Sequence, residues 1–168
     1  MNNTKTLTLC AAIFASTLVQ ALPSDTEQPI NVSADKAFMN KKSGVATYEG
    51  DVIVKQGSIE IEANLLKIFS DPETGELQRL EAEGTPSKFR QQIDESGALI
   101  VSEGDTLLYD TTAGKLEVNG NSYLKRDLDE IDAEYILYML NDETFRAENR
   151  GQGRVNMTLQ PSTTESNP

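Results

Sequence analysis

The segment YEGDVIVKQGSIEIEA, residues 48–63, contains the pattern that decides the fold. Apolar and polar residues alternate on both sides of Gln56-Gly57-Ser58, and most of the apolar residues are valine or isoleucine. Alternation with a period of two places successive side chains on opposite faces of a strand, and a short glycine-containing break between two such runs is typical of a hairpin. The segment therefore predicts two antiparallel strands, each with one apolar face.

The same pattern returns 70 residues later in the chain without a gap. Asp35, Gly44, Gly50, Lys55, Ile61 and Ala63 recur as Asp105, Gly114, Gly120, Lys125, Ile131 and Ala133. The apolar positions Phe38, Tyr48, Val54, Leu66 and Ile68 correspond to Leu108, Val118, Leu124, Ile136 and Tyr138. A repeat of fixed period indicates one supersecondary unit that is copied and stacked, so that each copy buries its apolar face against the next. Stacks of this kind are more often surfaces or conduits than catalytic pockets.

Turn signals divide the rest of the chain into short predicted strands joined mainly by hairpins. They lie at Lys42-Ser43-Gly44, Gln56-Gly57-Ser58, Asp71-Pro72-Glu73-Thr74-Gly75, Glu95-Ser96-Gly97, Thr112-Ala113-Gly114 and Asn119-Gly120-Asn121. Residues 133–140 could form a helical turn, but their copy at 63–70 has the pattern of a strand, so we predict no helix after residue 21. The predicted fold class is all-β, a stack of short antiparallel strands with an internal repeat.

A shorter pattern lies inside the repeat. A small residue followed by an acid or amide occurs at Ala34-Asp35, Ala63-Asn64, Gly104-Asp105 and Ala133-Glu134, and each is followed by a strand that carries Gly50, Gly84, Gly120 or Gly151. We interpret the small residue as a place where layers approach or where a strand bends. A simple strand kink is the alternative, and both interpretations give a stack of bent antiparallel strands.

The N-terminal 21 residues have the features of a secretory signal peptide. Lys5 supplies the positive charge, residues 7–18 the apolar run, and Val19-Gln20-Ala21 a cleavage site. The apolar run is shorter than the about 20 residues that a membrane span needs. We therefore expect a signal peptide (1–21), a flexible leader (22–27), a folded domain (28–159) and a disordered tail (160–168). Cleavage would also remove Cys10, so folding would rest on the core and on strand pairing.

The composition excludes most kinds of chemistry. The chain has no His and no Trp, and its one Cys lies in the expected signal peptide. The usual general base, the thiol nucleophile and most transition-metal sites are then missing, so we expect no enzyme activity and no cofactor. Paired carboxylates of the glycosidase type stay formally open. The net charge is −12, and −13 once Lys5 is removed; such a surface repels nucleic acid, which we exclude as a partner.

Residues 127–132 pack four carboxylates into six positions. Calcium accepts oxygen ligands at such spacing, but the segment lacks the glycine and the terminal glutamate of an EF-hand loop. It also falls at a predicted hairpin, where solvated acids are expected. We therefore predict a solvated turn here and no metal site.

The alternating apolar residues are the candidate functional residues, because a bent stack points one face of each strand inward. The inward candidates are Val32, Phe38, Tyr48, Val52, Val54, Ile59, Ile61, Leu66, Ile68, Phe89, Tyr109, Val118, Leu124 and Ile136. A closed, dry core is the simpler alternative. End strands of the stack would expose unpaired N–H and C=O groups, to which another chain can add edge to edge.

Several short motifs, taken in order, resemble one known family. They are Gln28-Pro29-Ile30, Tyr48-x-Gly50-x-Val52-x-Val54, Gly84-x-Pro86-x-x-Phe89, Gly120-Asn121-x-Tyr123-Leu124 and Ile131-x-Ala133-x-x-Ile136. The ordered set covers about residues 26 to 159 and is similar to the LptA/OstA-like family. The resemblance implies an antiparallel, V-shaped β-jellyroll, open at both ends, in the periplasm. It also implies that the protein carries lipopolysaccharide from the inner to the outer membrane through an apolar groove, in end-to-end oligomers, without chemistry of its own.

The resemblance also implies which parts of the chain meet ligand and partners. The lipid-binding set is Ile30, Val32, Phe38, Tyr48, Val52, Val54, Ile59, Ile61, Leu66, Phe89, Tyr109, Val118, Leu124 and Ile136. Residues 26–32 would form the edge that meets the inner-membrane-anchored export component. Residues 154–159 would pair with the next copy or with the jellyroll of the outer-membrane translocon. A membrane-anchored partner of the same system and a scaffold without ligand remain the alternatives.

The negative charge of the chain opposes the binding of lipid phosphates. We therefore expect the protein to hold the acyl chains and to leave the headgroup in solvent, where divalent cations would screen its charge. Lysines near the mouth of the groove would offset the repulsion locally, and the candidates are Lys55, Lys67, Lys88 and Lys125.

Overall fold

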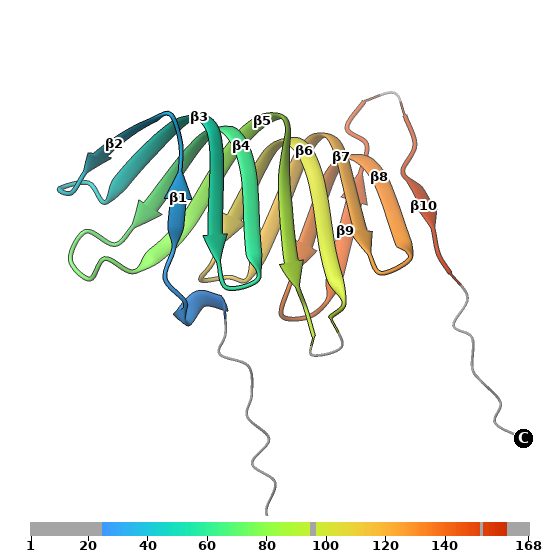
Figure 1. Cartoon of the computed structure of the whole chain (residues 1–168). Helices are drawn as coiled ribbons and strands as arrows, with labels where there is room; N and C mark the ends of the chain where they lie inside the picture. The colour runs from blue at the N-terminus through green and yellow to red at the C-terminus, as the bar shows by residue number, and fades with distance from the viewer. Residues whose placement is uncertain (1–24, 95–96, 152, 161–168) are drawn as a thin grey trace, which may run out of the picture.

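The computed structural model describes residues 25–94, 97–151 and 153–160, and within them one antiparallel sheet of ten strands (Figure 1). The elements are η1 (Asp25–Glu27), β1 (Asn31–Ser33), β2 (Lys36–Asn40), β3 (Val45–Gln56), β4 (Ile59–Ser70), β5 (Leu77–Gln92), β6 (Leu99–Asp110), β7 (Lys115–Arg126), β8 (Asp129–Met139), β9 (Thr144–Glu148) and β10 (Asn156–Thr158). The expected signal peptide and residues 161–168 lie outside the described residues. Residues 25–27, expected in the flexible leader, form the short 3-10 helix η1.

The prediction of short strands is wrong for the centre of the sheet. Strands β3 to β8 are 11 to 16 residues long. One predicted turn, residues 119–121, lies inside β7. Gly120 and Asn121 have positive φ angles of 73° and 47°, and the register between β7 and β8 shifts at this point. Residues that favour a turn also favour a β-bulge, so the chain bends here and continues as the same strand.

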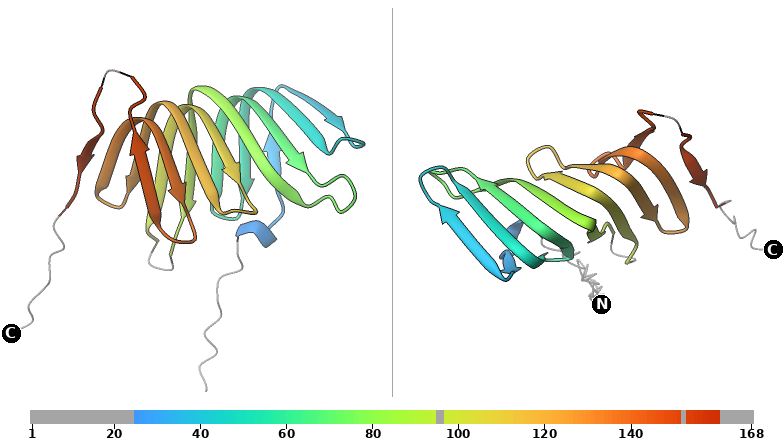
Figure 2. Two further views of the ribbon diagram at one scale, coloured as in Figure 1. Left: turned by 180° about the vertical axis from the view of Figure 1, so that it is seen from behind. Right: turned by 90° about the horizontal axis from the view of Figure 1, so that it is seen from above.

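The long strands bend in this way one beside the other, which folds the sheet into two layers. Register shifts fall at Glu49/Val52, Glu62/Leu65, Glu83/Ser87, Glu103/Thr106 and Asn119/Ser122. We call the half-sheet that contains β2, residues 45–49 of β3 and β9 layer A. The half-sheet that contains β1, residues 52–56 of β3 and β10 is layer B. The fold line is the set of bulges where the strands pass from one layer to the other. Figure 2 shows the bent strands from behind and from above.

Carboxylates packed against glycines mark the fold line. A Cβ atom added to Gly50 would lie 2.3 Å from Oδ2 of Asp35, and one added to Gly120 would lie 2.3 Å from Oδ2 of Asp105. Because both glycines also have positive φ, no other residue fits these positions without strain. The interpretation of the small-residue and acid pattern as a bend is therefore confirmed at two equivalent places.

The 70-residue repeat is confirmed in the same way. Strands β2 to β4 correspond to the second half of β6 together with β7 and β8. The carbonyl of Gly44 accepts a hydrogen bond of 2.8 Å from the N–H of Ser70, and that of Gly114 accepts one of 2.8 Å from the N–H of Leu140. The ambiguous segment 133–140 belongs to β8 up to Met139, as its copy predicted.

Each end of the folded sheet consists of two short strands. Both β1 and β2 pair with β3, and both β9 and β10 pair with β8. No strand of the described chain covers the outer edge of these four strands. The predicted all-β architecture, antiparallel and open at both ends, is confirmed. Among the described residues, no helix has the length and apolar character needed to cross a membrane.

Candidate functional site

Inward-facing residues of the two layers line up across the strands in three rows. Cross-strand partners share a face of the sheet, so a chain of partners traces one row from edge to edge. Row 1 is Met39, Ala46, Ile68, Leu80, Tyr109, Leu116, Tyr138 and Phe145. Row 2 is Ala37, Tyr48, Leu66, Ala82, Leu107, Val118, Ile136 and Ala147. Row 3, in layer B, is Val32, Val54, Ile61, Phe89, Ser102, Leu124, Ile131 and Met157.

Most of the predicted inward residues lie in or beside these rows. Ten of them are at most 5 % exposed, namely Val52, Val54, Ile59, Ile61, Leu66, Phe89, Tyr109, Val118, Leu124 and Ile136. Ile30, Val32 and Tyr48 are partly buried and pack against this core, and Ile68 belongs to it. The rings of Phe89 in layer B and Tyr109 in layer A meet with centroids 5.5 Å apart. The two layers therefore close on each other along the middle of the rows.

The prediction that Phe38 faces the interior is wrong: its side chain is 70 % exposed, and it alternates along β2 with the inner positions Ala37 and Met39. Strand β2 pairs with β3 in a register that places Phe38 opposite Thr47, between two inner positions. Its neighbour Met39 lies opposite the buried Ala46 instead. A shift of one residue reverses which face a strand residue occupies, so Met39 takes the inner position that was predicted for Phe38.

The repeat contained the signal for this position. An offset of 70 residues aligns Phe38 with Leu108 and Met39 with Tyr109. Tyr109 is buried and Leu108 is only partly so, in agreement with the outward position of Phe38. Copying the inward assignment of Tyr109 back to its repeat partner would have identified Met39.

The sequence did not predict that three serines are buried in the interior. The hydroxyl of Ser87 donates to the carbonyl of Gly104 (2.8 Å), that of Ser102 to Tyr123 (2.7 Å) and that of Ser122 to Glu134 (2.9 Å). Each hydroxyl satisfies a backbone acceptor, Ser87 and Ser122 next to the fold line and Ser102 in row 3. These serines are hydrogen-bonded to the backbone and are not arranged as nucleophiles.

The interior carries no charge among the residues that the structure describes. Its buried polar side chains are Gln56, Ser87, Ser102 and Ser122. Burial, assisted by the nearby charge of Asp25, raises the pKa of Tyr109 from 10.0 to about 12, so its phenol is neutral at physiological pH. Such an interior suits hydrocarbon chains.

The acidic segment 127–132 has the form of a turn and a strand start. The carboxylate of Glu130 pairs with Nζ of Lys125 at 2.7 Å, and this hydrogen bond lowers the pKa of Glu130. Oδ1 of Asp129 accepts from the N–H of Gln160 at 2.9 Å. Within the described ranges, no three His, Cys, Asp or Glu side chains are grouped in a way that would hold a metal ion.

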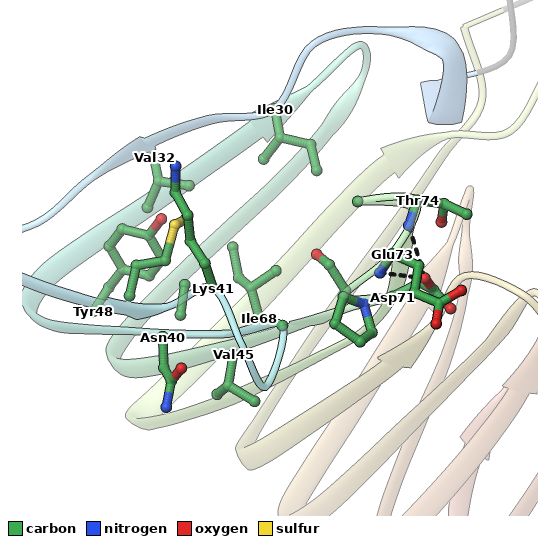
Figure 3. Close-up of a pocket in the computed structure, with 16 residues that line it drawn as sticks. Ile30, Val32, Asn40, Lys41, Val45, Tyr48, Ile68, Asp71, Glu73 and Thr74 are labelled. Atoms are coloured by element: carbon green, nitrogen blue, oxygen red, sulfur yellow. Dashed lines mark hydrogen bonds between the residues drawn. The ribbon is translucent and has the colours of Figure 1, made fainter.

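An open cavity of about 510 Å³, which we call the N-terminal chamber, lies at the β1–β2 end of the fold (Figure 3). Ile30 and Val32 line it beside layer B, and Tyr48 and Ile68 line it from layer A. Lys41 and Gly44 of the β2–β3 loop and residues 71–75 of the β4–β5 loop complete its wall. Its volume lies in the range of about 300–1,000 Å³ that is usual for small-molecule sites. The rows are therefore closed in the middle and accessible at this end.

Three of the lysines predicted near the groove mouth are held by carboxylates on the outer faces. Lys55 pairs with Glu60 (3.6 Å), Lys88 with Glu62 (3.5 Å), and Lys125 with Glu130. The lysine that lines the chamber is Lys41, which was not among those predicted.

Comparison with known proteins gives consistent matches. The family described as LptA/(LptD N-terminal domain) LPS transport protein matches residues 31–144. The lipopolysaccharide export system protein LptA of Haemophilus influenzae is 33 % identical over 159 residues, which is 94 % of this chain and 92 % of the relative. The corresponding protein LptH of Pseudomonas aeruginosa is 30 % identical over 158 residues, 89 % of each chain. A crystal structure of that LptH, described as the LptA-homologous periplasmic component of the conserved lipopolysaccharide transport device, aligns with a TM-score of 0.75 at 27 % identity, covering 83 % of this chain and 100 % of that one.

Proposed function

The chain belongs to the family of LptA and LptD N-terminal domain lipopolysaccharide transport proteins, and from this premise we propose that it binds lipopolysaccharide in the periplasm and carries it from the inner to the outer membrane. The observation that carries the proposal is the set of three inner rows. They run the whole length of the fold without a charged side chain, and both of their ends are open. A relative is described as the periplasmic component of a lipopolysaccharide transport device, which supports the location.

Acyl chains would lie along the rows between the two layers. Transfer of hydrocarbon out of water contributes about 0.8 kcal/mol per CH₂, which outweighs a modest repulsion of the headgroup. Because Phe89 and Tyr109 are buried against each other, lipid would have to part the layers or displace side chains between them. The fold line would stay intact during this movement and act as the hinge.

The two open ends would join successive copies into a continuous conduit. Strand β9 of one copy would run antiparallel to β2 of the next, and β10 antiparallel to β1. The joined sheet would then stay antiparallel across the contact. Row 1 would then continue from Phe145, 43 % exposed, to Met39 of the next copy, 60 % exposed, and row 3 from Met157 to Val32 of the next copy. These apolar side chains would be covered by the contact. The β1–β2 end of the first copy would meet the inner-membrane-anchored component, and the β9–β10 end of the last copy the outer-membrane jellyroll.

A photo-crosslinking residue placed at Phe89 in cells tests the proposal directly. In the control, the photo-crosslinking residue is placed instead of Glu60, a partly exposed residue that pairs with Lys55 on the outer surface. Lipopolysaccharide adducts are expected at position 89 and not at 60. Adducts at neither position, in protein that is folded and exported, would favour a scaffold with a dry core.

A further inference from the structure

Lys41 places a single free ammonium group at the N-terminal chamber. The residue belongs to the β2–β3 loop and lines the cavity together with the apolar side chains of Ile30, Val32 and Tyr48. Eight basic residues of the described chain are paired with carboxylates, and Lys41 is one of six that have no ion pair. Of these six, Lys41 alone lines the chamber. A cation without a partner beside an apolar cavity is notable in a chain with a net charge of −12.

The carboxylates of the chamber lie away from this lysine. Figure 3 shows the Lys41 side chain extending on the side of Val32 and Tyr48, with Asp71 and Glu73 on the other side of the cavity. The carboxylate of Asp71 accepts hydrogen bonds of 2.9 Å from the N–H groups of Glu73 and Thr74, which lower its pKa. Asp71 thus stabilises its own loop and leaves Lys41 available to an anionic ligand.

We propose that the N-terminal chamber is a headgroup site in which Nζ of Lys41 holds a phosphate of lipopolysaccharide while an acyl chain covers the apolar wall. The inference rests on the proposed function and adds to it a named cation and a named end of the fold. An ammonium–phosphate contact next to a hydrocarbon-lined cavity matches both parts of a phosphorylated amphiphile. It would also orient the lipid, with the phosphate at the chamber and the acyl chains directed toward the rows.

The test compares three variants of the full mature chain, Lys41→Ala, Lys41→Arg and Lys42→Ala. Lys42 is the matched control, because it is adjacent, exposed and absent from the chamber wall. The dissociation constant is measured for purified lipopolysaccharide and for the same preparation after enzymatic removal of its phosphates, each at low and at high ionic strength. Thermal melting of each variant checks that the fold is retained.

Lys41→Ala is expected to weaken binding of intact lipopolysaccharide by roughly threefold to tenfold at low ionic strength, as for a partly exposed charged contact. The loss should shrink at high ionic strength and vanish for the dephosphorylated lipid, while Lys41→Arg and Lys42→Ala stay close to the native protein. Equal binding by Lys41→Ala and the native chain would overturn the headgroup site and leave the proposed function in place. Failure of the native chain to bind either lipid would overturn the proposed function itself.

Discussion

At the scale of single residues, the fold line depends on contacts that leave no room for a side chain. Gly50 and Gly120 have φ angles of 80° and 73°, and each faces an aspartate that lies 70 residues from its counterpart in the other copy. At Asp105 both carboxylate oxygens also accept from the side-chain amide of Asn121, at 3.3 and 3.2 Å. The contact between Asn121 and Asp105 and the absence of a Cβ atom at Gly120 therefore both support the bend of β7.

Gly120→Ala should destabilise the fold more than Gly75→Ala. Both glycines have positive φ, 73° and 78°, but nothing lies within 4 Å of a Cβ added at Gly75. Gly75→Ala, the control, should therefore lower the free energy of unfolding by about 1–2 kcal/mol through backbone strain alone. Gly120→Ala should lower the free energy of unfolding by at least about 1 kcal/mol more, because the added Cβ atom meets the carboxylate of Asp105. Urea unfolding measures both losses, and Asp105→Ala should restore part of the difference. Equal losses would show that the contact does not hold the bend.

Tyr109 should make the protein sensitive to high pH. Burial raises its folded-state pKa to about 12, above the value of 10.0 expected in the unfolded chain. Unfolding then releases a proton from this group above pH 10, so its contribution to stability is complete below about pH 10 and is lost as the pH rises toward 12. Between pH 10 and pH 12 the contribution of Tyr109 to the free energy of unfolding falls by about 2 kcal/mol. Tyr109→Phe should flatten this part of the curve of unfolding free energy against pH. An unchanged curve would assign the alkaline loss to other groups.

At the scale of elements, side-chain hydrogen bonds tie the N-terminal segment to the edge of layer B, and most of them involve Asp25. The carboxylate of Asp25 in η1 accepts from the N–H of Ser58 (2.6 Å), its hydroxyl (2.8 Å) and the side-chain amide of Gln91 (2.9 Å). Gln28 is linked to the same edge, since its carbonyl accepts from the side chain of Gln56 at 3.1 Å. These bonds position the chain that leads into β1 and the chamber.

Asp25→Ala should loosen this segment without unfolding the sheet. Loss of an acceptor with three donors should speed amide hydrogen exchange in residues 25–33, while exchange in β4 to β7 stays slow. Glu27→Ala is the matched control, because it removes the same charge from the same short helix and Glu27 is exposed. Uniform acceleration across all strands would mean that the tether supports the whole fold.

At the scale of the whole molecule, the ends of the rows predict how two copies would meet. Continuation of rows 1 and 2 sets the register, with Phe145 beside Met39 and Ala147 beside Ala37 of the next copy. The same register places Glu148 beside Lys36 of that copy. Both ends of each row are apolar, and Met39, Phe145 and Met157 are exposed there, whereas a closed sheet would present charges or a covering element at these edges.

A disulfide scan tests this register. The mature chain is expected to have no cysteine, so Ala37→Cys with Ala147→Cys introduces one pair. The Cα atoms of paired residues on neighbouring antiparallel strands lie about 4.5–5.5 Å apart, which is within reach of a disulfide. Oxidation should produce a ladder of covalent oligomers. Met39→Cys with Ala147→Cys, displaced by two residues, is the control and should produce few. A ladder from the control pair alone would contradict the register.

The sequence by itself determined the class of the fold and most of the interior. Alternation with a period of two decides which faces are apolar, and the exact repeat makes each prediction in one copy a check on the other. Ten of the fourteen proposed lipid-binding residues are fully buried for this reason. The pairing of small residues and acids with glycines also marked the bends correctly, because these requirements are local to the backbone.

Only the tertiary structure decided which strand residues face each other. Turn-forming residues at 119–121 bend a strand or reverse it according to what lies across the sheet, so the strand lengths were underestimated. The outward position of Phe38 follows from the register of β2 on β3, which no local pattern specifies. Lys41, and not one of the four predicted lysines, lines the chamber because a loop from one layer meets the segment before β1 there. Register and loop position depend on contacts between distant residues, and these exist only once the sheet has folded.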